Sequence, residues 1–267
     1  MRKGLQVPVI ILSGVLILTG CSTPHYLYWP NSQLVPLYSE PKKLIVAPAF
    51  STSFVNSCFE LQAGYSFPGH IAVMTGFMAG GNNNSGQTYN DYCRLKYLEA
   101  AIGYYRSWAD IFVFEVYGGY GGGTQKHAMT YTDWYNWQLQ FHPDGTLEFS
   151  TSKLFLQADL GLKWKWIGGS FSFRFSRLNF NELIYEGVSY NLPKIHAIEG
   201  NRHPVCFEPA LSLFIGPDPI KFNLQLVLSK PLGTPEIDRT SSFEMARIMM
   251  GVVINIPTGR VKTEQNR

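Results

Sequence analysis

The sequence contains few charged residues. Lysine, arginine, aspartate and glutamate make up 15% of its 267 residues, against about 25% in an average soluble domain. The net charge is only +3, which excludes a role in binding nucleic acid. Aromatic residues also make up 15%, and glycine is abundant. This composition favours strands that face apolar surroundings on one side, and the length fits one large β domain.

The apolar run near the start is too short to cross a membrane as a helix. It extends from Leu5 to Leu18, whereas a membrane-spanning helix needs about 20 apolar residues. It follows the cationic start Met1-Arg2-Lys3, and this layout predicts a secretory signal peptide over residues 1–20. Removal of the signal takes away Arg2 and Lys3 and no acid, so the net charge falls from +3 to +1.

The signal ends in Leu18-Thr19-Gly20-Cys21, which resembles the lipobox of bacterial lipoproteins. The resemblance implies cleavage before Cys21, a thioether-linked diacylglycerol on its thiol, and an acyl chain such as palmitate on the new amine. Two or more acyl chains hold a protein stably on a membrane. Residue 22 is Ser rather than Asp and no acidic cluster follows, which implies outer-membrane localisation with the anchor in the periplasmic leaflet. The alternative is an ordinary signal peptide followed by a chance cysteine.

Motifs that carry chemistry are scarce. The six histidines show no metal-ligand spacing, and there is no nucleophile elbow, no paired CxxC and no dinucleotide-binding fingerprint. The glycine-rich run 118–123 opens no predicted helix, so it does not indicate phosphate binding. We therefore expect no metal, no cofactor and no enzymatic activity.

Three cysteines remain after Cys21, namely Cys58, Cys93 and Cys206. An odd number leaves at least one without an intramolecular partner. Two interpretations stay open. Cys58 and Cys93 form a disulfide, which an oxidising periplasm would allow, or all three are packing positions.

Strand patterns dominate the rest of the chain. Between Lys153 and Trp166, apolar residues from Leu154 to Trp166 alternate strictly with a second, more polar face, which is the two-residue period of a strand. A second clear alternation runs from Ile220 to Ser229. The same rule predicts ten strands, at residues 43–52, 58–67, 70–79, 94–106, 110–120, 153–166, 170–180, 205–215, 219–229 and 243–256.

Short and long connections alternate between these strands, as in outer-membrane barrels with periplasmic turns and long external loops. The link between the first two strands is an exception, because it is short but lies at the long-loop end. We expect an all-β, antiparallel up-and-down β-barrel of about ten strands, with 8–12 allowed, over residues 43–256. Residues 131–151 either extend two strands or add two more. Residues 21–42, with four prolines, are expected to form an irregular lipid-anchored tether, and residues 257–267 a polar tail. An even strand number places both termini at the turn end, in agreement with a periplasmic anchor.

Several strands open with an apolar residue followed by an acid or amide, and in four of them glycine follows four residues later. A spacing of four places both on the same strand face, here the polar one. We expect these residues to point into the barrel and to pair with Lys163, Lys165, Arg174 and Lys221, because buried charge without a partner is costly. A catalytic carboxylate pair is the weaker alternative. The predicted inward polar face comprises Glu60, Glu99, Glu115, Gln157, Asp159, Lys163, Arg174 and Glu208.

Four stretches are similar to Bacteroidetes outer-membrane lipoproteins with a β-barrel-like body, a family of unknown function. They are Trp29–Leu37, Leu98–Tyr105, Phe114–Gly121 and Leu154–Gly161. The resemblance implies a barrel and an outer-membrane address but transfers no catalytic residue and no ligand. One departure is the polar tail after Ile256, since integral barrels usually end on an aromatic residue. The barrel is therefore either inserted unusually or held at the membrane by its lipid alone.

These observations predict a lipid-anchored outer-membrane barrel with a structural, binding or accessory role in the cell envelope. Its expected partners are membrane lipid, through Cys21, and an envelope protein complex. The alternatives are an outer-membrane enzyme acting on lipid or lipopolysaccharide, and a narrow pore. Ten strands with long inward side chains leave little lumen, because water-filled channels have about 16 strands.

Overall fold

The computed structural model shows a chain that is almost entirely antiparallel β-structure. It describes residues 26–53, 56–83, 92–109, 111–135, 138–187, 192–234 and 243–258. The signal peptide, Cys21 and the tail beyond residue 258 lie outside this part of the chain.

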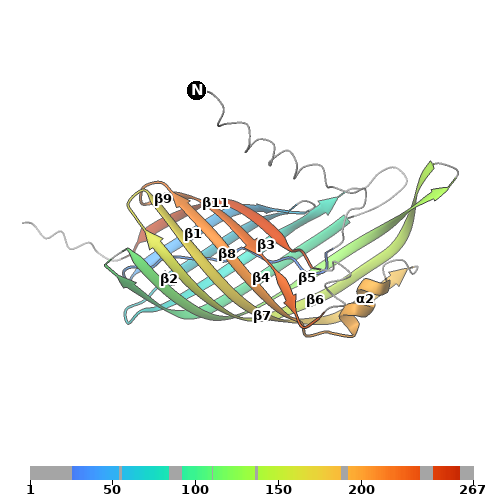
Figure 1. The fold of residues 1–267 in the computed structure, drawn as a ribbon, viewed down its shortest axis with the longest axis horizontal. Helices are drawn as coiled ribbons and strands as arrows, with labels where there is room; N and C mark the ends of the chain where they lie inside the picture. Colours follow the sequence, from blue (N-terminus) through green and yellow to red (C-terminus); the bar gives the residue numbers. More distant parts are fainter. Residues whose placement is uncertain are drawn as a thin grey trace, which may run out of the picture.

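The strands close into a barrel of ten strands, which confirms the predicted fold (Figure 1). Each strand pairs antiparallel with the next from β1 to β9, β9 pairs with β11, and β11 pairs back with β1. The short β10 pairs with β8 and extends the edge begun by β9. The strands are β1 (Lys43–Thr52), β2 (Ser57–Ser66), β3 (Ile71–Asn83), β4 (Tyr92–Trp108), β5 (Phe112–Tyr135), β6 (Gln138–Lys163), β7 (Ile167–Gly187), β8 (Val205–Ile215), β9 (Ile220–Leu228), β10 (Lys230–Leu232) and β11 (Ala246–Pro257).

The two ends of the barrel differ, as the alternating connections predict. At one end, named here the turn end, β2–β3, β4–β5, β6–β7 and β8–β9 are joined by three or four residues each. At the other, the loop end, β5 and β6 stay paired from Phe112↔Leu162 as far as Tyr135↔Gln138. Residues 131–151 therefore extend two strands and add none. The helix α2 (Leu192–Glu199) lies at the same end (Figure 1), in a region between the predicted strands 170–180 and 205–215 for which no helix was predicted.

The outer face of the barrel is apolar. On β9, for example, Ile220, Phe222, Leu224, Leu226 and Leu228 are exposed, while the residues between them are buried. Exposed aromatic side chains gather at the turn end, namely Phe67, Trp108, Phe112, Trp164 and Trp166. Soluble proteins rarely expose so large an apolar surface, and an apolar band with flanking aromatic residues is typical of outer-membrane barrels. No helix in the described ranges is long and apolar enough to span a membrane.

The segment before β1 lies inside the barrel. Every residue from 27 to 38 is buried, and we name this stretch the lumen segment. Its backbone is irregular, as its prolines indicate, apart from a parallel bridge between Tyr28 and Phe243. The expectation of a tether outside the barrel is therefore corrected for these residues: they fill its interior.

An arginine placed on the outer face should destabilise the barrel according to its depth. Leu156, in the body of β6, and Trp164, at the turn end, are both more than half exposed. We expect Leu156→Arg to lower the free energy of unfolding in lipid vesicles by about 2–4 kcal/mol, and Trp164→Arg by about 0–1 kcal/mol. Urea titration in phospholipid vesicles measures both. Equal effects would contradict a membrane around β6.

Candidate functional site

The lumen is the most highly organised polar region of the protein. Of the eight predicted inward residues, seven are buried inside the barrel, namely Glu60, Glu99, Glu115, Gln157, Asp159, Arg174 and Glu208. Lys163 is half-buried near the turn end. Six of the eight bond to the lumen segment, namely Glu60, Glu99, Glu115, Gln157, Arg174 and Glu208. Lys163 bonds to Ser39, the residue after the segment, and Asp159 bonds to its neighbours on the wall.

Near the loop end, Tyr28 is held by a buried carboxylate. Its hydroxyl donates to Glu208 at 2.5 Å, and Ser176 donates to the other oxygen of Glu208 at 2.6 Å. The Tyr28 ring meets the Phe243 ring edge-on, with centroids 5.3 Å apart. Side chains from both ends of the sequence thus meet here.

Trp29 fills a second part of the loop end. It packs with Cys58 and Cys93, and the Arg247 guanidinium lies 5.4 Å from the centre of its ring. Arg247 is paired with Glu244 at 2.7 Å. The described cysteines, which include Cys206, form no disulfide, so a Cys58–Cys93 bond is absent and the packing interpretation describes their positions.

A charged cluster occupies the middle of the lumen. Glu99 lies 3.2 Å from Lys153 and 3.3 Å from Arg174. Both cations also donate to the Asn31 side-chain oxygen, at 2.6 and 3.3 Å, and Arg174 donates to Gln157 at 2.6 Å. One acid, two cations and two amides from four segments form a connected network.

Beside this cluster, amide and carboxylate side chains bind the backbone of the lumen segment. Glu60 accepts from the Ser32 backbone N–H at 3.0 Å and also from the Ser32 hydroxyl. Gln62 donates to the Ser32 carbonyl at 2.8 Å. Gln225 both accepts from the Gln33 N–H and donates to the Gln33 carbonyl, each at 2.8 Å. These side chains form the hydrogen bonds to the segment's backbone that a neighbouring strand would otherwise form.

The same pattern continues to the turn end. Gln157 donates to the Leu34 carbonyl at 3.0 Å, Glu115 accepts from the Tyr38 N–H at 2.7 Å, and Lys163 donates to the Ser39 hydroxyl at 2.9 Å. Asp159 does not reach the segment and instead accepts from Gln157 and Ser172.

Two glycines of the repeated strand motif make room for the lumen segment. A Cβ added at Gly161 would lie 2.1 Å from a methyl carbon of Leu37, and one added at Gly64 would lie 2.6 Å from the Tyr38 hydroxyl. Gly103 and Gly119 leave similar room for the rings of Tyr117 and Phe155. The motif therefore combines an acid or amide that forms hydrogen bonds in the lumen with a glycine that leaves space for a neighbouring side chain.

The predicted partners of the inward acids are only partly right. Arg174 pairs with Glu99 as expected, but the second cation beside Glu99 is Lys153, which was not among the predicted partners. Lys165 is exposed in a turn. Lys221 lies 3.6 Å from Asp218, in the β8–β9 turn. Burial there raises the pKa of Asp218, but Lys221, Lys43 and a hydrogen bond from Asn255 outweigh it and hold that pKa below its ordinary value.

A buried cysteine and histidine lie close together near the loop end. The Cys93 sulfur is 3.6 Å from the Nε2 atom of His127, whose ring stacks on Phe149. Both residues are almost fully buried, so this pair faces no open cleft. Within the described ranges, no group of three or more histidine, cysteine or acidic residues is placed to hold a metal.

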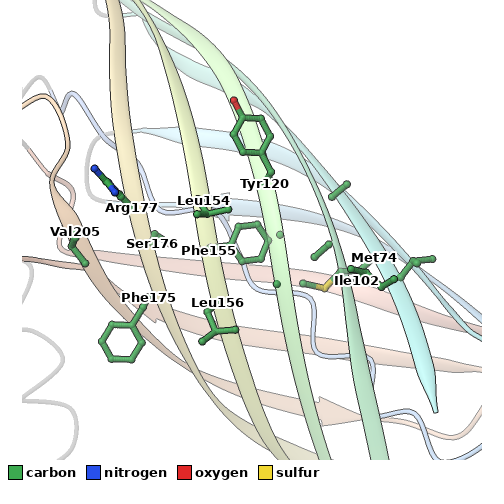
Figure 2. Close-up of a pocket in the computed structure, with 15 residues that line it drawn as sticks. Met74, Ile102, Tyr120, Leu154, Phe155, Leu156, Phe175, Ser176, Arg177 and Val205 are labelled. Carbon is green, nitrogen blue, oxygen red and sulfur yellow. The ribbon is translucent and has the colours of Figure 1, made fainter. Parts of the chain in front are cut away.

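A shallow apolar groove crosses the barrel wall over β3 to β8. Figure 2 shows Ile102, Tyr120, Leu154, Leu156 and Phe175 around it. The groove is present because the small residues Ala100 and Gly118 lie between larger side chains. A Cβ added at Gly118 would meet nothing within 4 Å, so the space above this residue is open. The larger side chains around the groove are exposed on the same outer face as the apolar band.

Comparison with known proteins gives little beyond the fold. No family model matches the sequence, and no curated protein matches it. One solved structure with a similar shape is LpxR from Salmonella typhimurium, with 8% sequence identity and a TM-score of 0.36, over 79% of this chain and 99% of LpxR. LpxR is an outer-membrane enzyme, and the expectation that the present chain is not an enzyme is therefore withdrawn. At this level of similarity, the comparison assigns no activity.

Removing the central acid should cost much more than removing an exposed one. Glu99→Gln leaves Lys153 and Arg174 buried without a carboxylate, and loss of one partner from a buried ion pair costs about 3–5 kcal/mol of unfolding free energy. The matched control is Glu148→Gln, because Glu148 pairs with Lys126 on the exposed surface, where ion pairs contribute little. Urea titration of both variants measures the difference, and a Glu99→Gln barrel as stable as the control would contradict the network.

Proposed function

We infer that this protein is an integral outer-membrane barrel, lipid-modified at Cys21, whose lumen is sealed by its own N-terminal segment. Its role is binding or accessory, within the cell envelope, and it is exerted from the loop end. The observation that carries this proposal is the combination of an apolar outer face with an interior filled by residues 27–38.

The outer face supports insertion of the barrel in a membrane. Its exposed leucine, isoleucine and phenylalanine side chains would face water if the lipid on Cys21 alone held the protein to the membrane. At about 25 cal/mol per Å² of apolar surface, burying such a face in lipid stabilises the inserted state strongly. The closed sheet also satisfies the backbone hydrogen bonds that the hydrocarbon core requires.

The filled lumen argues against the pore. A conducting barrel needs a continuous water path, whereas Asn31, Ser32 and Gln33 are 0–5% exposed at the centre of this one. They are bonded to the wall on several sides, as described above.

The loop end is the part best built to meet a partner. Ile195 and Ile198 of α2 pack on Leu147 of β6 and Phe180 of β7, and Leu27 joins the same cluster. The base of the extended hairpin of β5 and β6 and the helix thus pack together with the start of the lumen segment. A surface whose elements already pack on one another suits recognition of another envelope protein, because little of it has to become ordered on binding.

The barrel should remain in the membrane without its lipid. We expect Cys21→Ala, which cannot form the thioether, to stay in the membrane fraction after extraction with alkaline carbonate, because the apolar outer face holds it there. Release of the variant into the supernatant would overturn the proposal that the barrel is embedded.

The lumen segment should control permeability. We expect the full-length protein to give no steady single-channel openings in planar bilayers, and a variant lacking residues 27–38 to give them, because the inward polar side chains would then be hydrated. Retention of folded mobility on unheated gels is the control for the deletion. Equal conductance of the two proteins would show that the segment does not seal the barrel.

A further inference from the structure

The lumen segment runs through the barrel in one direction. The contacts that the segment and the residue after it make with β6 follow in order: Asn31 with Lys153, Leu34 with Gln157, and then Ser39 with Lys163. Because β6 starts at the tip of the extended hairpin and ends at the tight turn before β7, the order of contacts shows that the segment descends from the loop end to the turn end.

The first residues of the segment lie at the loop end. Tyr28 bonds to Glu208, close to the start of β8, and its carbonyl accepts from the Glu244 N–H at 3.0 Å, just before β11. Trp29 packs on Cys58, the second residue of β2. All three strands begin at the loop end.

The residues that follow the lumen segment lie at the turn end. The Lys42 N–H donates to the carbonyl of Ser66 at 2.7 Å, at the end of β2, and β1 then begins at Lys43, opposite Pro257. Between Tyr28 and Lys42 the chain therefore passes through the whole length of the barrel before its first strand begins.

The chain before Tyr26 is too short to return to the turn end. Cys21 precedes Tyr26 by five residues, which span at most about 18 Å when fully extended. The apolar band of such barrels is about 25 Å tall. The lumen offers no second passage, because the segment already fills it.

We propose that the N-terminal segment crosses the membrane inside the barrel, so that Cys21 and its lipid lie on the loop side. With the loops facing outward, the acyl chains enter the outer leaflet and the N-terminus is displayed at the cell surface. This inference rests on the proposed function for the membrane and for the modification of Cys21. It reverses the periplasmic leaflet that Ser22 and the absence of an acidic cluster after Cys21 implied. The even strand number agreed with that leaflet only because the chain was taken to pass directly from the anchor into β1.

Labelling of single cysteines with a membrane-impermeant maleimide tests the topology. The full-length protein provides a low background, since Cys58, Cys93 and Cys206 are buried and the thioether blocks Cys21. Three variants carry one added thiol each: Thr23→Cys beside the anchor, Glu199→Cys on α2 at the loop end, and Lys165→Cys in the turn before β7. Each is labelled in intact cells and again after the outer membrane is permeabilised.

The expected result is that Thr23→Cys behaves like Glu199→Cys, with full labelling in intact cells, while Lys165→Cys is labelled only after permeabilisation. Labelling of Thr23→Cys in step with Lys165→Cys would overturn the threaded topology. The proposed function fails in different ways. Labelling of the unsubstituted protein would show that Cys21 carries no lipid, and labelling of Lys165→Cys but not Glu199→Cys in intact cells would show that the turns face outward.

Discussion

An irregular chain buried inside a barrel must have hydrogen-bond partners for its backbone, and the structure is organised around that requirement. A buried N–H or C=O group without a partner costs as much as a lost hydrogen bond. The lumen segment has no neighbouring strand over most of its length, so the wall supplies side chains instead. Glu60 and Glu115 accept its N–H groups, Gln157 donates to a carbonyl, and Gln225 does both. The acids and amides of the repeated motif thus have a structural use that needs no catalysis.

The lumen segment connects three parts of the protein, which are the polar lumen, the helix α2 and the predicted lipid attachment site. The same segment supplies hydrogen-bond partners to the polar side chains of the lumen, packs beneath α2 through Leu27, and leads to the predicted site of lipid attachment. The central cluster of Glu99, Lys153 and Arg174 would be costly in a dry interior, but Asn31 provides a further acceptor for both cations. Asn31 therefore replaces part of the hydration that Lys153 and Arg174 lose when the segment fills the lumen.

The sequence alone predicts the wall of the barrel well and its filling poorly. The bounds of β1 and β8 match their predicted ranges, because strict alternation against an apolar exterior fixes which residues face outward. Which residues line the interior follows from the same alternation. The lumen segment has no such period, and its partners are distant, with Gln33 and Gln225 separated by 192 positions. Its prolines indicate irregular backbone but do not distinguish a free tether from a buried plug. The eight-residue α2 carries too weak a pattern to stand out from a loop.

The barrel encloses its own N-terminal chain. This chain is joined covalently to β1 at the turn end, so the lumen segment could leave the barrel only if its N-terminal end slid down through the lumen. Acyl chains on Cys21 would oppose this movement, because the hydrocarbon would have to pass the buried charges of Glu99 and Arg174. On the proposed topology, lipid modification does more than hold the protein on a membrane, because it also keeps the lumen segment inside the barrel. The sheet must then close around the segment while the barrel folds.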